Sequence, residues 1–122
     1  MHKSRLGAVI IDCQTENLSQ QASFWGQALG LNPERSDDRY VWLKGRDEDV
    51  QVIAQKVDHP SRVHIDIETD DINAEVKRLE LLGAIIVEKM EKWVVMEAPS
   101  KHRFCIIKPT RSDFETNANV WD

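Results

Sequence analysis

The sequence predicts an α+β domain made of two similar β-α-β-β-(β) repeats. The first observation is an apolar, strand-like run at Val9–Cys13, followed by a helix-like pattern that starts at Leu18. The second is the return of this order further along the chain, because Asp12 and Asp66 (66 − 12 = 54) and Leu18 and Ile72 (72 − 18 = 54) share one spacing. A fixed period of this size is typical of chains built from repeated supersecondary units. Each copy mixes strands with a helix, so the predicted class is α+β.

The first repeat begins with a buried strand and an amphipathic helix. Leu6–Cys13 is almost continuously apolar and rich in β-branched residues, which indicates a buried strand. Asn17 is placed to cap the next helix, with Gln20 as its capping-box partner, and Gly30 to end it in the left-handed conformation. The helix collects its apolar residues on one face, which we expect in the core: Leu18, Ala22, Trp25 and Leu29.

The remainder of the first repeat alternates turns and strands. Pro33–Asp38 is turn-like, and Arg39–Lys44 and Val50–Gln55 are predicted strands. The polar Gly45–Asp49 joins these two strands as a hairpin connection.

The second repeat follows the same plan. Arg62–Glu68 is its first strand, and Asp70 and Asp71 lie at the start of its helix, where aspartates accept hydrogen bonds from unpaired N–H groups. The expected buried face of that helix is Ile72, Val76, Leu79 and Leu82. Three further strands are predicted at Ile85–Glu88, Lys92–Glu97 and Phe104–Lys108.

These elements predict one domain at 1–108, with repeats at about 6–57 and 62–108. Residues 109–122 form a polar C-terminal tail, apart from Phe114 and Trp121. We expect these two rings to hold the tail against the body of the protein or against a partner subunit.

Composition excludes several classes of function. The chain has 122 residues, 41% of them hydrophobic, which suffices for one core. Its net charge of −5 disfavours nucleic acid as a partner. No apolar run reaches the roughly 18 residues of a membrane span, and no secretory signal is seen at the start. Cys13 and Cys105 lie in apolar strands and are expected to stay reduced. We therefore expect a cytoplasmic protein without a membrane partner.

The ordered set of motifs resembles the vicinal oxygen chelate superfamily, which includes glyoxalases, bleomycin-resistance proteins and extradiol dioxygenases. The resemblance is closest to its glyoxalase-like domain branch, covers roughly 6–108 and rests on these segments: Ile11–Cys13, Ser23–Trp25, Leu29–Gly30, His64–Ile67, Asp70–Ile72, Leu82–Ala84, Met96–Pro99 and Phe104–Cys105. The resemblance implies two βαβββ modules whose sheets form an open, cupped barrel. It also implies a homodimer.

Family enzymes hold a divalent cation in that cup, with ligands from the first and last strands of each module. Carried onto this chain, the ligand positions of the second repeat fall at His64 and Cys105. In the first repeat they fall at Ile10 and at Gln51 or Ile53. Isoleucine cannot coordinate a cation, and a thiol is a poor ligand for a hard one. The resemblance thus implies an incomplete metal site.

Several side chains are candidates for a site. His64 and Asp66 share one face of their predicted strand, where His64 can be a base or metal ligand, and Asp12 and Asp66 can orient it or bind a ligand. The alternatives are a histidine satisfied by a neighbouring carboxylate and aspartates that serve the packing of the repeats. Trp42 and Trp93 lie on hairpin strands, where their rings can line a pocket. Cys105 is either a soft ligand or a core thiol.

Three hypotheses follow for the function. The first is a small-molecule-binding protein of the glyoxalase type, enzymatic or not. As an enzyme it would be a lyase or isomerase that acts next to a carbonyl, with His64 as the base or as a ligand of a divalent metal ion. The second is a non-catalytic protein that sequesters a compound, as resistance proteins do. The third is a structural or regulatory subunit whose cup is filled by its own side chains.

Overall fold

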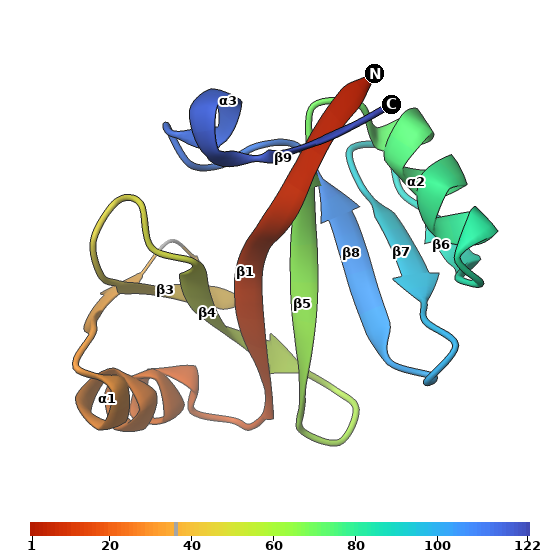
Figure 1. Cartoon of the computed structure of the whole chain (residues 1–122). Helices are drawn as coiled ribbons and strands as arrows, with labels where there is room; N and C mark the ends of the chain where they lie inside the picture. Colours follow the sequence, from red (N-terminus) through yellow and green to blue (C-terminus); the bar gives the residue numbers. More distant parts are fainter. Residues whose placement is uncertain (36) are drawn as a thin grey trace. The chain divides into compact units, whose positions relative to one another are not determined.

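The computed structural model describes residues 1–35 and 37–122. The chain divides into two compact units: residues 8–64, here called the N-unit, and residues 1–7 with 65–122, here called the C-unit. The elements are β1 (His2–Gln14), α1 (Leu18–Leu29), β2 (Asn32–Arg35), β3 (Tyr40–Lys44), β4 (Gln51–Val57), β5 (Arg62–Thr69), α2 (Ile72–Leu81), β6 (Ile85–Lys89), β7 (Val94–Glu97), β8 (Arg103–Ile107), α3 (Phe114–Asn117) and β9 (Asn119–Trp121). Figure 1 shows their course along the chain.

The N-unit is a four-stranded sheet with α1 on one face. Its strand order is β2-β3-β4-β1, with β4 parallel to β1 and the other neighbours antiparallel. The core between α1 and the sheet consists of Leu18, Ala22, Val41, Leu43 and Ala54, with Trp25 packed against it. The pattern of strands and helix in the first repeat is therefore as predicted.

The ends of α1 follow from its sequence, but its buried face is partly different. Asn17 Oδ1 accepts a hydrogen bond from Gln20 N at 3.1 Å, and Gly30 has φ 71°. The prediction that Leu29 is in the core is wrong, because that side chain is 50% exposed. Gly26 is the buried residue of the last turn. A Cβ on it would lie 2.9 Å from Leu31 O, so the absence of a side chain lets the helix end approach the following segment.

The turn predicted at Pro33–Asp38 is also wrong in its first part. Pro33 lies within β2, paired with Leu43 of β3. Proline is tolerated there because β2 is the edge strand and needs no N–H on its outer side. The Ser36 part of this prediction lies outside the described residues.

The C-unit repeats the topology of the N-unit. Its strand order is β5-β8-β7-β6, with β5 parallel to β8 and the other neighbours antiparallel. Its core contains Val76, Leu79, Ala84, Val94, Met96, Phe104 and Ile106. Asp71 caps α2 by accepting a hydrogen bond from Ala74 N at 3.0 Å. The prediction that Leu82 is buried is wrong, because α2 ends at Leu81 and Leu82, as its C-cap, is 66% exposed.

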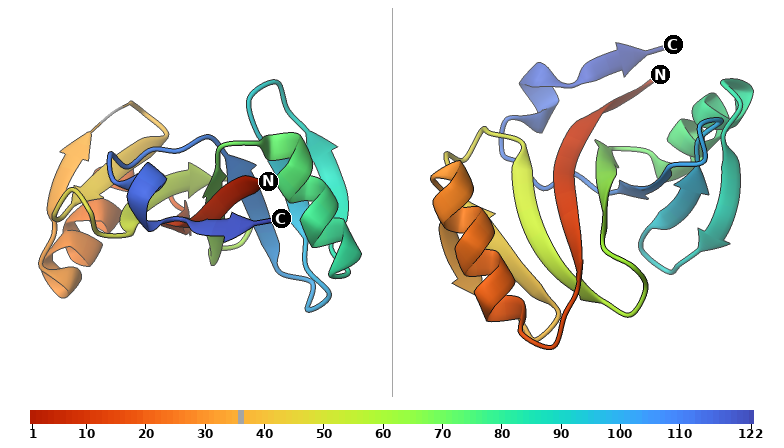
Figure 2. Two further views of the ribbon diagram at one scale, coloured as in Figure 1. Left: turned by 45° about the horizontal axis from the view of Figure 1, so that its top comes forward. Right: turned by 90° about the horizontal axis from the view of Figure 1, so that it is seen from below.

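The C-terminal segment is ordered and belongs to the C-unit. β9 pairs in antiparallel fashion with the start of β1, as the views in Figure 2 show. Phe114 is buried, and Trp121 Nε1 donates a hydrogen bond to Ser4 Oγ at 2.8 Å. The guanidinium of Arg78 lies 3.9 Å from the centre of the Trp121 ring, a cation–π contact.

Both repeats thus have the order βαβββ and the same pairing of first and last strands, and the predicted α+β class is confirmed. None of the helices in the described part of the chain is long and apolar enough to cross a membrane.

Candidate functional site

Asp12 and His64 form a close pair inside the N-unit. Oδ2 of Asp12 lies 2.6 Å from Nδ1 of His64, and the two side chains are only 2% and 15% exposed. A carboxylate oxygen accepts hydrogen bonds, so the N–H at Nδ1 of His64 donates a hydrogen bond to Oδ2 of Asp12. Nε2 is therefore the nitrogen of His64 that can take up a proton or coordinate a cation.

Asp12 has a second oxygen that no described neighbour satisfies. Nε of Arg62 lies 3.8 Å from Oδ2, so Arg62 and His64 approach the same oxygen. Oδ1 is buried and has no hydrogen-bond partner among residues 1–35 and 37–122. Leaving such an atom unpaired costs about 1–3 kcal/mol or more, and such atoms in proteins usually bond a buried water molecule, an ion or a ligand. Sequence reasoning did not single out Arg62, although its position two residues before His64 on one strand is a usable signal.

A set of potential metal ligands follows β5 and β8. Asp66 and Cys105 are partners in the parallel register of these strands. The ligand atoms of Asp66 and Cys105, both in the C-unit, lie within 4.8 Å of each other. His64, the last residue of the N-unit, precedes Asp66 by two residues on β5. Among the described residues, neither Cys105 nor Cys13 is in a disulfide. Burial raises the pKa of the Cys13 thiol, and the charge of Asp12 adds to that effect, so Cys13 stays protonated.

The same strand pairing corrects the alignment of the two repeats. Asp12 pairs with Gln55 as Asp66 pairs with Cys105, so the first-repeat counterpart of Cys105 is Gln55 and neither Gln51 nor Ile53. The offset of 54 residues between the repeats does not hold at this strand. The paired residues are 55 − 12 = 43 positions apart in the first repeat and 105 − 66 = 39 in the second. Two of the additional residues lengthen the helix, which has 12 residues in α1 and 10 in α2, and the others lie between the helix and the last strand.

Asp12 lies on the sheet face away from α1. Val41, Leu43 and Ala54 pack against α1, so their alternating neighbours point to the opposite face. In register, one row across that face is Asp12–Gln55–Tyr40, and the next row is Ile10–Ile53–Trp42. Tyr40 and Gln55 were not predicted as site residues, although their alternation with the buried positions of β3 and β4 would have shown them. Trp42 thus lies on the same sheet face as Asp12.

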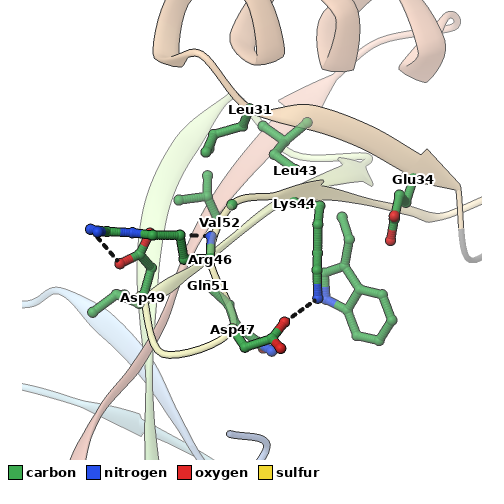
Figure 3. Close-up of a pocket in the computed structure, with 12 residues that line it drawn as sticks. Leu31, Glu34, Leu43, Lys44, Arg46, Asp47, Asp49, Gln51 and Val52 are labelled. Carbon is green, nitrogen blue, oxygen red and sulfur yellow. Dashed lines mark hydrogen bonds and ion pairs between the residues drawn. The ribbon is translucent and has the colours of Figure 1, made fainter.

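Trp42 lines a separate pocket at the end of the β3–β4 hairpin. It has a volume of about 270 Å³ and is lined by Trp42, by apolar side chains such as Leu31 and by the hairpin turn. Figure 3 shows Lys44 paired with Asp47 at 3.0 Å and Arg46 paired with Asp49 at its mouth. His64 and Asp12 do not line it. Gln51 lines this pocket, whereas Gln55 lies in the same row as Asp12. The two glutamines are four residues apart along β4, a distance of about 13 Å at 3.3 Å per residue.

Trp93 lies in the turn before β7 rather than on a strand, and it lines a different pocket with Ile72 and Met90 of the C-unit. The residues predicted for a single site therefore do not form one site in the structure. Asp12 and His64 form a pair in the N-unit, and Asp66 and Cys105 are strand partners in the C-unit. Trp42 and Trp93 each line a separate pocket.

Comparison with solved structures defines the class of fold. The chain is similar to an Mn(II)-bound glyoxalase from Novosphingobium aromaticivorans, with a TM-score of 0.65 and 17% identity over 88% of this chain and 40% of that one. A hypothetical protein from Bacillus halodurans C-125 matches with a TM-score of 0.67 and 9% identity, over 89% of this chain and 96% of that one. A homoprotocatechuate 2,3-dioxygenase from B. fuscum matches with a TM-score of 0.64 and 13% identity, over 87% and 32%. The glyoxalase and the dioxygenase are thus much longer than this chain. The glyoxalase and the dioxygenase belong to the vicinal oxygen chelate superfamily.

The sequence itself identifies the family. Residues 8–107 match the model of the glyoxalase-like domain, and the chain belongs to that family. No curated protein matches the sequence. The predicted resemblance is confirmed.

The donor set indicates which cation this site would accept. The Mn(II) named for the Novosphingobium glyoxalase prefers oxygen and nitrogen ligands. His64, Asp66 and Cys105 offer one nitrogen, one oxygen and one sulfur. Imidazole and thiolate are ligands that a borderline cation such as Zn²⁺ accepts. The side chains present are therefore compatible with a divalent cation of the zinc type.

Proposed function

We propose that this protein is a glyoxalase-like enzyme of the lyase or isomerase type, which moves a proton at a carbon next to a carbonyl group of a small molecule. The observation that carries this proposal is the buried carboxylate of Asp12. One of its oxygens holds His64 at 2.6 Å, and the other is buried without a described donor. A general base needs a basic nitrogen in a fixed orientation, and a substrate site needs an unsatisfied polar group to receive the substrate.

His64 is the proposed base and Asp12 its positioning residue. Asp12 holds the proton on Nδ1, which leaves Nε2 as the basic nitrogen, and its negative charge stabilises the imidazolium that forms when Nε2 takes up the substrate proton. Oδ1 of Asp12 would accept a hydrogen bond from a hydroxyl group of the substrate or from a water molecule bound with it.

The sheet face around Asp12 supports a small, partly apolar substrate. Tyr40 and Trp42 are partly exposed on this face, and Ile53 lies between Trp42 and Ile10 in the same row. Aromatic and aliphatic side chains beside a few polar groups are the usual composition of small-molecule sites.

Binding of a divalent cation is the alternative role of His64, with the imidazole as a ligand instead of the base. Asp66, two residues further along β5, would be a second ligand, and the cation would supply Lewis acidity to a substrate carbonyl. Asp12 would then orient a ligating histidine through Nδ1, as carboxylates commonly do behind metal-bound histidines. A bound cation and the substrate proton compete for Nε2, so metal content decides which of the two tasks His64 performs.

The first test is elemental analysis of the protein purified without chelator, followed by proton exchange in ²H₂O. Methylglyoxal and dihydroxyacetone, with and without glutathione, serve as carbonyl probes, and NMR follows deuterium entering the carbon next to the carbonyl. His64→Ala should lower the exchange rate about 10²- to 10⁴-fold, the usual contribution of a general acid–base group.

His59→Ala is the matched control, because His59 is an exposed histidine that hydrogen-bonds to the carbonyl of its neighbour Pro60. It should keep the wild-type rate. Wild-type exchange no faster than the uncatalysed reaction with every probe, or equal rates in wild type and His64→Ala, would rule out the proposed catalysis.

A second candidate, sequestration of a compound without turnover, is favoured by the Trp42 pocket. That pocket is preformed and partly apolar, and neither Asp12 nor His64 lines it. Quenching of tryptophan emission that disappears in Trp42→Phe but persists in His64→Ala would support sequestration in this pocket. The homodimer and the cytoplasmic location stay predictions.

A further inference from the structure

The C-unit has a groove on the α2 side of its sheet that plays no part in the proposed reaction. It has a volume of about 370 Å³, within the range of small-ligand sites, and lies between α2 and the β6–β7 hairpin. Figures 1 and 2 show α2 running beside this hairpin. Val94 lines the groove and belongs to the core under α2. Cys105 alternates with the core residues Phe104 and Ile106, so its side chain points to the opposite face of the sheet.

The floor of the groove is apolar and its wall is aromatic. Ile72, Val76 and Ile86 form the floor, and Met90 and Trp93 are partly exposed at the hairpin turn. A half-exposed indole beside a methionine offers a flat and adaptable surface to an apolar body.

The charged residues of the groove favour an anion. Three lysines and two glutamates line it: Lys77, Lys89, Lys92, Glu80 and Glu91. The net charge of the lining is therefore 3 − 2 = +1, although the whole chain has a net charge of −5. Within the described part of the chain, none of these three lysines takes part in a salt bridge. Their ammonium groups are therefore available to a ligand, whereas the lysine and arginine at the mouth of the Trp42 pocket are neutralised by Asp47 and Asp49.

We propose that this groove binds a small amphipathic anion, with an aromatic or aliphatic body against Trp93 and an acidic group at the lysines. The apolar floor supplies most of the affinity, because burying apolar area contributes about 25 cal/mol per Å². The lysines select an acidic ligand over a neutral one of the same shape, since exposed charges contribute more to selectivity than to affinity.

The test uses 8-anilino-1-naphthalenesulfonate and its uncharged analogue N-phenyl-1-naphthylamine as probes. Binding is followed by energy transfer from tryptophan to the probe. The sulfonate should bind at least about fivefold more tightly than the neutral analogue, and its Kd should rise with salt concentration, because the lysine contacts are exposed and screened by salt. Lys89→Gln with Lys92→Gln should raise the sulfonate Kd about tenfold and leave the Kd of the neutral probe nearly unchanged.

Lys101→Gln with Lys108→Gln is the matched control, because it removes the same charge from exposed positions outside the groove, and it should change the Kd less than twofold. Trp93→Ala should weaken binding of both probes and remove most of the energy transfer, whereas Trp42→Ala should not. Circular dichroism melting curves confirm that each variant is folded. Equal affinity for the two probes, an unchanged Kd in the Lys89 and Lys92 variant, or loss of binding in Trp42→Ala instead of Trp93→Ala would overturn the proposal.

Discussion

The two repeats share their backbone plan but differ in the chemistry of their first strands. β1 is parallel to β4 as β5 is parallel to β8, and Asn17 and Asp71 cap the two helices in the same way. Along the first strands, however, Ile10 corresponds to His64. The two repeats therefore share their topology and strand register, whereas only the second repeat supplies the imidazole.

Each repeat contributes one residue to the pair of Asp12 and His64. His64 belongs to the second repeat by sequence, yet it lies in the N-unit and donates to Asp12 of the first repeat. The candidate site therefore uses the first strand of both repeats, and neither repeat contains it alone.

The largest expected loss of stability is at Glu68, a position that is buried in the second repeat and exposed in the first. Glu68 is fully buried and accepts bonds from Arg5 Nε at 2.7 Å and from Thr110, whereas its counterpart Gln14, 68 − 54 = 14, is exposed. Glu68→Ala should lower the free energy of unfolding by about 3–5 kcal/mol, because it removes the buried carboxylate that pairs with Arg5 and Arg111 and accepts a hydrogen bond from Thr110. Gln14→Ala, the matched control, should cost less than about 1 kcal/mol. Urea denaturation measures both, and equal losses would show that the copies are not as different as the structure indicates.

The next effect separates Asp12 from an ordinary buried carboxylate. Asp12→Asn keeps the size of the side chain but removes the charge behind His64, so kcat for proton exchange should fall about 10- to 100-fold with a smaller change in KM. The pH profile of kcat should also change, since the charge that stabilises the imidazolium is lost. Asp58→Asn, at an exposed position, serves as the control. A loss of stability with an unchanged pH profile would reduce Asp12 to a structural role.

Acid should weaken the C-unit through two carboxylates. Burial alone would raise the pKa of Glu75, but hydrogen bonds from Arg78 and His2 outweigh it and lower that pKa below 4.5. The Arg5 guanidinium lowers the pKa of Asp113 from 3.8 to about 2. A lowered pKa in the folded state stabilises the fold above the unfolded pKa, and this stabilisation is lost as the pH falls through the folded value. The free energy of unfolding should therefore fall between about pH 4 and pH 2.

Glu75→Gln tests this expectation, because the variant cannot gain a proton at that position. Its free energy of unfolding should depend less on pH than that of the wild type. Denaturation curves from pH 2.5 to pH 6 compare the two proteins, and parallel pH dependences would contradict the role of Glu75.

The smallest effect is expected where the repeats are most alike. Asn17→Ala and Asp71→Ala each remove one capping hydrogen bond, and each should cost about 1 kcal/mol. Asp71→Ala should cost slightly more, because the negative charge also interacts with the dipole of α2. Thermal melts of the two variants measure the two losses of stability. If one loss were ten times the other, the two helix starts would not be equivalent.

Several features could be predicted from the sequence because they depend on local interactions. The helix caps at Asn17 and Asp71, the left-handed Gly30 and the repeat itself depend on residues that are close along the chain. The predicted burial of Leu29 failed because Gly26, three residues earlier, allows a close approach that hydrophobic periodicity does not register.

The contacts of the candidate site were decided by tertiary structure. The hydrogen bond between Asp12 and His64 joins residues 52 positions apart, and the partners of Glu68 lie up to 63 positions away. The register that makes Gln55 the counterpart of Cys105 depends on loop lengths that differ between the repeats. Local propensities determine where a strand or helix starts and ends, but a buried polar group takes whichever partner the packed chain brings within about 3 Å, and that pairing is a property of the whole fold.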